Sequence, residues 1–252
     1  MRYFVQLAYN GNPFHGWQTQ PNATTVQEIL DKALSIILRQ KIDTLGCGRT
    51  DAGVHAREFY AHFDVIDHSH QHDLLSARFL KSLNSLLPYE IAIKKLIPVD
   101  DRAHARYDAT LRSYEYLIHH HKDPFLHNRS WLLFDRLDIN LMNQAAAEML
   151  NYTDFTSFSK SNTQVFTNNC KIIKAEWTAH QTGLKFTISA DRFLRNMVRA
   201  IVGTLVPIGK GLDSPEHIHD VIKSKDRSNA GSSVPACGLY LTEVKYPYIN
   251  DY

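Results

Sequence analysis

Residues 46–64 read GCGRTDAGVHAREFYAHFD, and this stretch joins a glycine-rich bend to a strand. Asp51 lies in the bend, two positions after Arg49, with glycines on both sides. From Phe59 to Phe63 apolar residues alternate, as expected for a strand with one buried face. A carboxylate on such a bend either bonds its own backbone to form a turn or has a chemical function. The stretch alone leaves both interpretations open.

The rest of the chain alternates between strand patterns and helix patterns. Thr25 and Glu28 form a capping box, which predicts the start of a helix. Pro88 ends a second predicted helix, and Ser214 with Pro215 predicts the N-cap and first turn of another. The predicted strands cover residues 3–9, 57–64, 91–99, 111–118, 184–190 and 238–246, and the predicted helices cover 25–37, 73–87, 141–150, 193–206 and the residues after 214.

We therefore expect an α+β fold of two similar α/β-sandwich halves, in which each half packs helices on an antiparallel sheet. The predicted domains are residues 1–104, an N-terminal α+β domain that carries the Asp51 loop, and residues 105–252, a C-terminal α+β domain. A central cleft between two such halves is the natural place for a binding site.

The composition is that of an ordinary globular protein. Hydrophobic residues make up 44 % of the 252 residues, and no stretch approaches the roughly 18 consecutive apolar residues that a membrane-spanning helix needs. The first residues, MRYFVQLAYN, lack the blocks of a signal peptide, so we expect a cytoplasmic protein. The three cysteines are widely spaced without a CxxC pair, which argues against a disulfide framework and a thiolate zinc site. Histidines cluster at 68–72 and 119–121, and solvated loop histidines are a better interpretation than a metal site.

The formal net charge of +2 says nothing by itself about a nucleic-acid partner, because phosphate-binding proteins show their charge locally. Arg192, Arg195 and Arg199 recur at spacings of three and four residues, so on a helix they share one face. Without another clue, such a cluster is more often a solvated charged face than a binding site.

Six ordered blocks resemble the tRNA pseudouridine synthases of the TruA type, which act on the anticodon stem-loop. The blocks are YNGNPFHGWQTQP (9–21), GRTDAGVHA (48–56), AHARYDATLRSYEY (103–116), DFTSF (154–158), FLRNMVRAIVG (193–203) and ACGLYLTEVKY (236–246). They span nearly the whole chain, whereas a lone RTD motif would be a weak signal. Cys47 and the aromatic, acidic residues 58–60 depart from the commonest family version, which puts the local RNA contacts there in doubt.

The resemblance implies two α+β halves whose antiparallel sheets join across a cleft, a homodimer, and isomerisation of uridine to pseudouridine at tRNA positions 38, 39 and 40. It implies no cofactor and no metal. The residues it carries over as catalytic are Asp51 as the nucleophile, Tyr114, and Arg199 as the basic partner of the aspartate. The substrate-binding residues it implies are Tyr114, Arg49, Arg112, Arg195 and Leu239. Arg195, one turn from Arg199, is the alternative ion-pair partner.

The reaction breaks the N1–C1′ bond, turns the uracil and forms a C5–C1′ bond, so it needs no redox or group-carrying cofactor. A carboxylate can act at an anomeric carbon, as in retaining glycosidases. Asp51 can attack C1′, add to C6 of the ring, or assist loss of the C2′ proton, and the sequence leaves these routes open. Tyr114 either stacks on the extruded base or accepts the C5 proton.

A paired uridine must be flipped out of its stem, and phosphate contacts must supply that free energy. The candidate contacts are Arg192, Arg195, Lys210 and Lys160. Two rival functions remain at this level. A silent RNA-binding protein has no use for Asp51, and a glycosidase or nucleosidase needs a second carboxylate, for which Glu58 and Asp64 are the nearby candidates.

Overall fold

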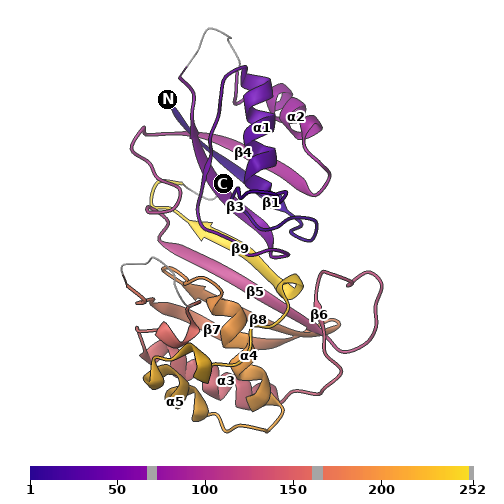
Figure 1. Cartoon of the computed structure of the whole chain (residues 1–252), viewed down its shortest axis with the longest axis vertical. Coiled ribbons are helices and arrows are strands. Elements are labelled where there is room, and N and C mark those ends of the chain that lie inside the picture. Colours follow the sequence, from indigo (N-terminus) through magenta and orange to yellow (C-terminus); the bar gives the residue numbers. More distant parts are fainter. Residues whose placement is uncertain (67–72, 161–166, 250–252) are drawn as a thin grey trace. The chain divides into compact units, whose positions relative to one another are not determined.

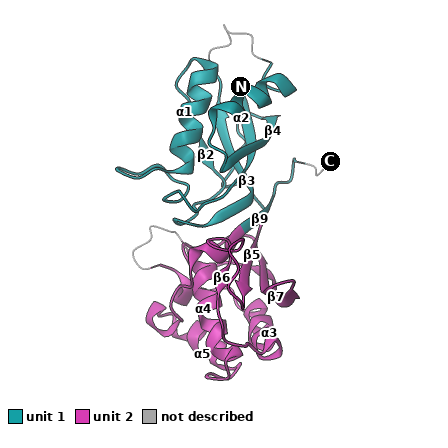
Figure 2. Cartoon of the chain, turned by 90° about the vertical axis from the view of Figure 1, so that its right-hand side faces the viewer, with its two compact units in different colours: residues 1–110, 241–252 teal, residues 111–240 magenta. Residues whose placement is uncertain are grey.

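The computed structural model describes residues 1–66, 73–160 and 167–249 of the chain. The histidine cluster at 68–72 lies outside these described residues. The chain forms two compact units, residues 1–110 with 241–252, and residues 111–240 (Figure 2). The expected domains 1–104 and 105–252 differ from these units in two places, because residues 105–110 and the C-terminal segment from Leu241 belong to the first unit. Within the described part of the chain, no helix is long and apolar enough to cross a membrane.

Unit 1 is an antiparallel sheet with helices on one face (Figure 1). Strand β1 (Arg2–Tyr9) lies between β3 (His55–Asp64) and β4 (Ile91–Val99), and Val5 pairs with Ala61 on one side and Leu96 on the other. The remaining elements of this unit are β2 (Leu45–Gly46), α1 (Val26–Leu38), α2 (Ala77–Leu86) and the end of β9 (Leu239–Lys245), which follows β3 in the sheet order.

Helix α1 begins where the capping pattern predicted. The Thr25 hydroxyl accepts a hydrogen bond from the N–H of Glu28 at 3.4 Å, which satisfies one of the free donors of the first turn. The helix buries one stripe against the sheet: Val26, Leu30, Ala33, Leu34 and Leu38. It ends at Arg39, whose φ of 54° takes the chain out of the helix.

Unit 2 repeats the two-layer plan with different lengths. Strand β8 (Gly183–Ala190) lies antiparallel between β5 (Leu111–His119) and β7 (Ile172–His180), and short β6 (Trp131–Leu132) runs parallel to β5. The helices are α3 (Ile139–Glu148), α4 (Met197–Gly209) and α5 (His217–Ser224), with 3-10 turns at Met149–Asn151, Thr156–Phe158, Arg227–Asn229 and Ala236–Gly238. Trp177 and Phe186 pack ring to ring at 4.9 Å in the buried layer between sheet and helices.

The α+β class is confirmed, because both units combine helices with antiparallel strands. Two local predictions were wrong, and one long strand was missed. The helix after Ser214 begins at His217 with Glu216 as its N-cap, so Ser214 and Pro215 form the turn before it. Strand β7 was not predicted. Arg192 and Arg195 do not share a helix face with Arg199, because α4 begins only at Met197.

The reason for the last error is the backbone at Asn196. This residue has φ 68° and ψ 2°, the left-handed conformation, directly before α4. Asparagine adopts this region more readily than most residues. A left-handed residue interrupts the helical path, so the chain around Arg195 is not part of the helix that carries Arg199.

Candidate active site

Asp51 stands on a bend that main-chain contacts hold against the segment before α1. Trp17 N–H donates to the Thr50 carbonyl at 3.2 Å, and Gly53 N–H donates to the Phe14 carbonyl at 3.3 Å. A Cβ on Gly16, which has φ 90°, would lie 2.5 Å from the Thr50 carbonyl oxygen. The two segments therefore touch backbone to backbone, and only glycine fits at this point.

Side chains add a buried layer beneath the same bend. The Tyr9 hydroxyl and the Thr50 hydroxyl are hydrogen-bonded at 2.8 Å in the interior of unit 1. Trp17 packs on Phe59 with ring centroids 4.1 Å apart. A Cβ on Gly46 would meet the Trp17 indole at 2.5 Å, so this glycine serves packing instead of loosening the bend. The residue before Asp51 is therefore fixed by both its main chain and its side chain.

The turn itself does not depend on the carboxylate. Its closing hydrogen bond runs from the N–H of Val54 to the main-chain carbonyl of Asp51 at 3.1 Å, and Gly53 supplies the positive φ of 78°. Any residue at position 51 can accept this bond. The Asp51 side chain is half-buried, and Arg49 beside it is exposed. The main-chain bond therefore closes this turn whatever side chain stands at position 51.

Unit 2 contains the other predicted site residues, and β5 carries two of them. Tyr114 is half-buried and meets the Phe193 ring edge to face at 5.1 Å. Arg112 shares its face of the strand, two positions away, and is only 8 % exposed. Its Nη1 donates to the Asp191 carbonyl at 3.0 Å. Arg112 therefore supports the turn before Arg192, whatever else it binds.

Arg195 and Arg199 lie on either side of the left-handed Asn196. Arg195 is exposed, and its main-chain carbonyl accepts from Lys160 N–H at 3.1 Å. Arg199 is half-buried in the first turn of α4, and its Nε donates to the Val234 carbonyl at 2.7 Å. Leu239 is 6 % exposed at the start of β9, so its side chain offers little surface to a ligand.

Lys210 does not belong with these arginines. It follows the C-terminal end of α4, eleven residues after Arg199, which corresponds to roughly 16 Å along a helix. Its ammonium pairs with the Asp135 carboxylate at 2.8 Å. We therefore remove Lys210 from the candidate phosphate contacts and keep Arg192, Arg195 and Lys160.

The two candidates for the second carboxylate of a hydrolase, Glu58 and Asp64, have structural partners in unit 1. Glu58 accepts from the Gln6 amide at 3.0 Å and from the main-chain N–H of Val244 at 2.9 Å. Asp64 accepts from the Arg2 guanidinium through both oxygens, each at 2.8 Å, and Arg2 lowers the pKa of the Asp64 carboxyl. Such bonds hold the sheet and its last strand together.

Beneath Tyr114, the next tyrosine on the same strand face is structural. Tyr116 is fully buried, and its hydroxyl donates to the Pro235 carbonyl at 2.8 Å. Burial raises the pKa of this hydroxyl above its ordinary value. Tyr116 therefore remains protonated and anchors the chain segment that leads to β9.

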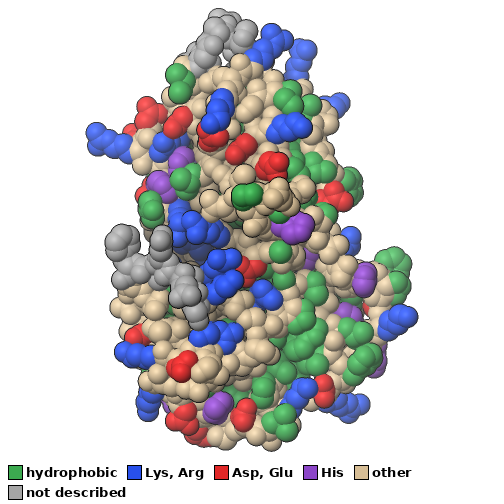
Figure 3. Space-filling model, viewed as in Figure 1, with side chains coloured by type: hydrophobic (Ala, Val, Ile, Leu, Met, Phe, Trp, Pro, Cys, Tyr) green, Lys and Arg blue, Asp and Glu red, His purple; other side chains and the backbone are tan. Residues whose placement is uncertain are grey.

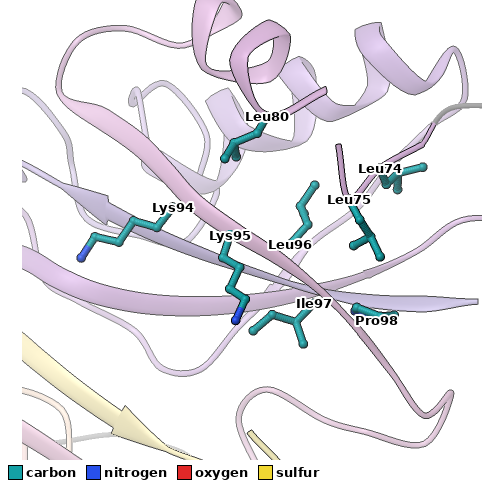
Figure 4. A pocket seen from close by; sticks show the side chains of 8 residues that line it. All are labelled: Leu74, Leu75, Leu80, Lys94, Lys95, Leu96, Ile97 and Pro98. Atoms are coloured by element: carbon teal, nitrogen blue, oxygen red, sulfur yellow. The ribbon is translucent and has the colours of Figure 1, made fainter. Parts of the chain in front are cut away.

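A groove of about 330 Å³ lies elsewhere in unit 1, at the side of α2 (Figure 4). Its lining is apolar apart from two lysines, and consists of Leu74, Leu75, Leu80, Lys94, Lys95, Leu96, Ile97 and Pro98. None of the predicted site residues takes part. In the described residues, no group of three histidine, cysteine or acidic side chains is placed to hold a metal ion.

Comparison with known proteins gives consistent matches. A family model described as tRNA pseudouridine synthase matches residues 145–247. A tRNA pseudouridine synthase A of Parabacteroides distasonis is 50 % identical over 247 residues, or 98 % of this chain and 96 % of the relative. The same name belongs to a Porphyromonas gingivalis relative, 50 % identical over 98 % of this chain and 97 % of its own. A Bacillus subtilis relative of that name is 37 % identical over 98 % and 99 %.

Proposed function

This chain belongs to the tRNA pseudouridine synthases of the TruA type, and from that premise we propose that it isomerises uridine to pseudouridine at positions 38, 39 and 40 of tRNA, with Asp51 as the nucleophile. The observation that carries this proposal is the bend at Asp51. Its neighbours are fixed by main-chain contacts, and its closing hydrogen bond is made by the main-chain carbonyl of Asp51. A reaction at a single carbon requires that the attacking group be held rigidly in position.

In this proposal Asp51 of unit 1 works with two residues of unit 2, Arg199 and Tyr114. Arg199 pairs with the carboxylate and aims it. Tyr114 stacks on the extruded base, a contact worth about 1–3 kcal/mol. The support is that both side chains are half-buried and held in place, Arg199 by its hydrogen bond to the Val234 carbonyl and Tyr114 by its ring contact with Phe193. Arg49, which is exposed, contacts the substrate.

The Arg199 assignment makes a specific prediction about catalysis and binding. Replacing Arg199 with Met removes the charge that fixes Asp51, so turnover should be abolished while tRNA affinity falls much less. A variant that binds tRNA poorly and turns over the bound fraction normally would assign Arg199 to the phosphates instead. Arg195→Met is the matched comparison, because it removes the alternative partner, which lies just before α4.

Hydrolysis is the less supported chemistry. Glycosidases use two carboxylates because an alcohol leaving group needs an acid. Glu58 and Asp64 accept hydrogen bonds at both of their oxygens from other parts of unit 1. One catalytic carboxylate is sufficient for an isomerase, in which uracil leaves and returns without a water molecule attacking the sugar.

Base flipping requires binding energy from the phosphates, and we assign these contacts to Arg192, Arg195 and Lys160. Each phosphate neutralised should add close to one unit to the slope of log affinity against log salt, by analogy with about 0.9 for B-DNA. Removing one of these charges should lower the slope by about the same amount. A slope near zero for the intact protein would contradict the proposed contacts.

We also include a homodimer in the proposal. Unit 2 carries exposed aromatic side chains in the segment that flanks β6, with Phe125 81 % and Phe134 73 % exposed. Figure 3 shows a hydrophobic area on this unit. Large exposed apolar areas on a protein mark surfaces that interact with another molecule. Sedimentation of wild type and of Phe125→Ser/Phe134→Ser tests whether the segment forms the dimer contact.

The reaction is tested with tRNA labelled with tritium at uracil C5. Three substrates carry a single uridine at position 38, 39 or 40, and a fourth carries none at these positions. We expect tritium release from the first three and none from the fourth, since C5 loses its hydrogen when the new bond forms. No release from any substrate would end the enzyme proposal, and free uracil would identify a hydrolase.

A further inference from the structure

The segment from Ala230 to Pro235 crosses α4 in unit 2, and we call it the strap. Its contact with the helix is made by backbone. The N–H of Gly231 donates to the Thr204 hydroxyl at 2.9 Å, and that hydroxyl donates to the Ala200 carbonyl at 2.9 Å. A Cβ on Gly203 would overlap the carbonyl of Ser232. The strap is therefore seated directly on the helix that carries Arg199.

Further along, the strap holds the Arg199 side chain. The carbonyl of Val234 accepts from Arg199 Nε at 2.7 Å. In return, the N–H of Val234 donates to the main-chain carbonyl of Arg199 at 3.3 Å. This reciprocal pair restricts the guanidinium to one direction, because displacement of Val234 breaks both bonds. The next carbonyl, that of Pro235, accepts from the buried Tyr116 hydroxyl at 2.8 Å.

One cation holds the strap in shape. Arg227 Nη1 donates to the carbonyls of Ala230 and Gly231 at 3.2 and 3.1 Å. Its Nη2 donates to the Ser233 hydroxyl at 3.1 Å. Three bonds from two nitrogens need the planar guanidinium, since a lysine ammonium lacks this fork. Arg227 is half-buried and lies just before the strap in a 3-10 turn.

The same hydroxyl connects the strap to the left-handed residue before α4. The Asn196 amide donates a short hydrogen bond to Ser233 Oγ. Asn196 lies between Arg195 and Arg199 and sets the point where the helix begins. Arg227 and Asn196 thus meet on one oxygen, and the strap fixes both the start of α4 and the arginine in its first turn.

We propose that Arg227 is a positioning residue for pseudouridine formation: through the strap it aims Arg199 without touching the tRNA. This inference rests on the proposed role of Arg199. Catalytic groups lose activity steeply when displaced, with 1 Å costing as much as about 100-fold. Loss of Arg227 should therefore lower kcat and leave substrate binding nearly intact.

The test compares Arg227→Gln, Arg227→Lys and Ser233→Ala with Arg136→Gln, which removes an exposed arginine of the same unit. For Arg227→Gln we expect kcat about 10- to 100-fold lower, with the Kd for tRNA within about threefold of the control. Arg227→Lys should recover part of kcat, because it keeps the charge but not the fork. If Arg227→Gln does not fold, Arg227→Lys and Ser233→Ala carry the same comparison.

Whether the kcat losses of two substitutions add distinguishes a positioning role of Arg227 from a general loosening of unit 2. Arg227 and Asn196 act on Ser233, so the double variant Arg227→Gln/Ser233→Ala should lose little more kcat than the worse single variant. A kcat equal to that of Arg136→Gln, or equal losses in kcat and tRNA affinity, would overturn the inference. If wild type itself releases no tritium, the proposed function fails instead, so the two failures are distinguishable.

Discussion

Gly203 of α4 and Gly231 of the strap meet so closely that neither position has room for a side chain. A Cβ on Gly203 would overlap the Ser232 carbonyl, and a Cβ on Gly231 would overlap the Gly203 carbonyl. Two segments that are 28 residues apart in the sequence thus touch through main-chain atoms. This contact places the strap, and through Val234 it also places Arg199.

Replacing Gly203 with alanine tests this contact, because the contact reverses the sign of the stability change that the substitution would otherwise cause. In an ordinary helix interior the change stabilises by about 1 kcal/mol. Here the methyl group must push the strap off the helix, so we expect a lower melting temperature and reduced tritium release. Gly48→Ala is the matched control for stability, because a Cβ at Gly48 meets no atom within 4 Å. A Gly203→Ala protein as stable as wild type would contradict the close contact.

Asp31 predicts a pH dependence of stability. Burial raises the pKa of this carboxyl to about 6, although the Thr44 N–H and hydroxyl bind its Oδ1 at 2.9 and 2.6 Å. A folded pKa above the unfolded value of 3.8 means that the contribution is fully present below about pH 4 and is lost as pH rises through 6. Asp31→Asn keeps the acceptor oxygen without the charge. Between pH 4 and pH 8, the unfolding free energy of this variant should therefore rise by about 1–2 kcal/mol relative to that of wild type.

Urea unfolding at a series of pH values measures this difference. Asp43→Asn is the control, since the Asp43 side chain is 71 % exposed and pairs with Lys41 at the surface. The Asp43 variant should follow the wild-type profile. A constant offset between Asp31→Asn and wild type across the pH range would show that the buried charge does not govern stability.

The buried His62 imidazole should give the opposite dependence of stability on pH. Burial, with the nearby positive charge of Arg2 as the next cause, lowers the pKa of this imidazole to about 4. Its Nδ1 accepts from the N–H of Ala105 at 3.1 Å, so protonation removes an acceptor inside unit 1. The contribution is fully present above the unfolded value of 6.5 and is lost as pH falls from there through about 4. His104, packed against His62, and the carboxylates Asp64 and Asp108 also act on this group.

His62→Asn should therefore be less stable than wild type at pH 7 and lose less stability on acidification to pH 4, by about 2–3 kcal/mol. The exposed His180→Asn is the control and should keep the wild-type slope. An unchanged slope in His62→Asn would show that this histidine is not the acid-sensitive group.

Tyr114→Phe separates the two roles of that ring. The edge-to-face contact with Phe193 involves the ring and not the hydroxyl, so the variant keeps the stacking surface. If stacking is the whole role, single-turnover rates on C5-tritiated tRNA should stay within a few-fold of wild type. A large fall with unchanged tRNA binding would assign the hydroxyl to proton transfer from C5. Tyr114→Ser, which removes the ring, provides the comparison for lost stacking.

Local patterns predicted most elements because their periodicity reflects one-sided burial. The apolar stripe of α1 corresponds to residues buried on one side of the helix. In β3 the predicted single buried face was wrong, because the residues from Phe59 to Phe63 are all buried and both faces of the strand are covered. Strand β7 escaped this reasoning for a physical reason. Its register shifts between Ile172 and Lys174, and charged residues occupy its exposed positions, so the alternation is broken.

The sequence predicted individual residues of the candidate site, but not the contacts that position them. The motif around Asp51 and the helix with Arg199 could be found from sequence, because short patterns carry them. The strap could not, since its function arises from contacts of Arg227, Ser233 and Val234 with α4 that no local periodicity encodes. The amide of the left-handed Asn196 likewise donates to Ser233, a contact between distant parts of the sequence. The arginine spacing by itself therefore predicts a continuous helical face.

The most direct measurement of the central claim is tritium release by Asp51→Asn from tRNA labelled at C5 of uridine 38, 39 or 40. The change keeps the size of the side chain and the main-chain turn to Val54, and removes only the charged oxygen. We expect folding and tRNA binding like those of wild type, with release reduced to background in single-turnover conditions. Release at a rate near that of wild type would contradict Asp51 as the nucleophile and would require another residue to open the glycosidic bond.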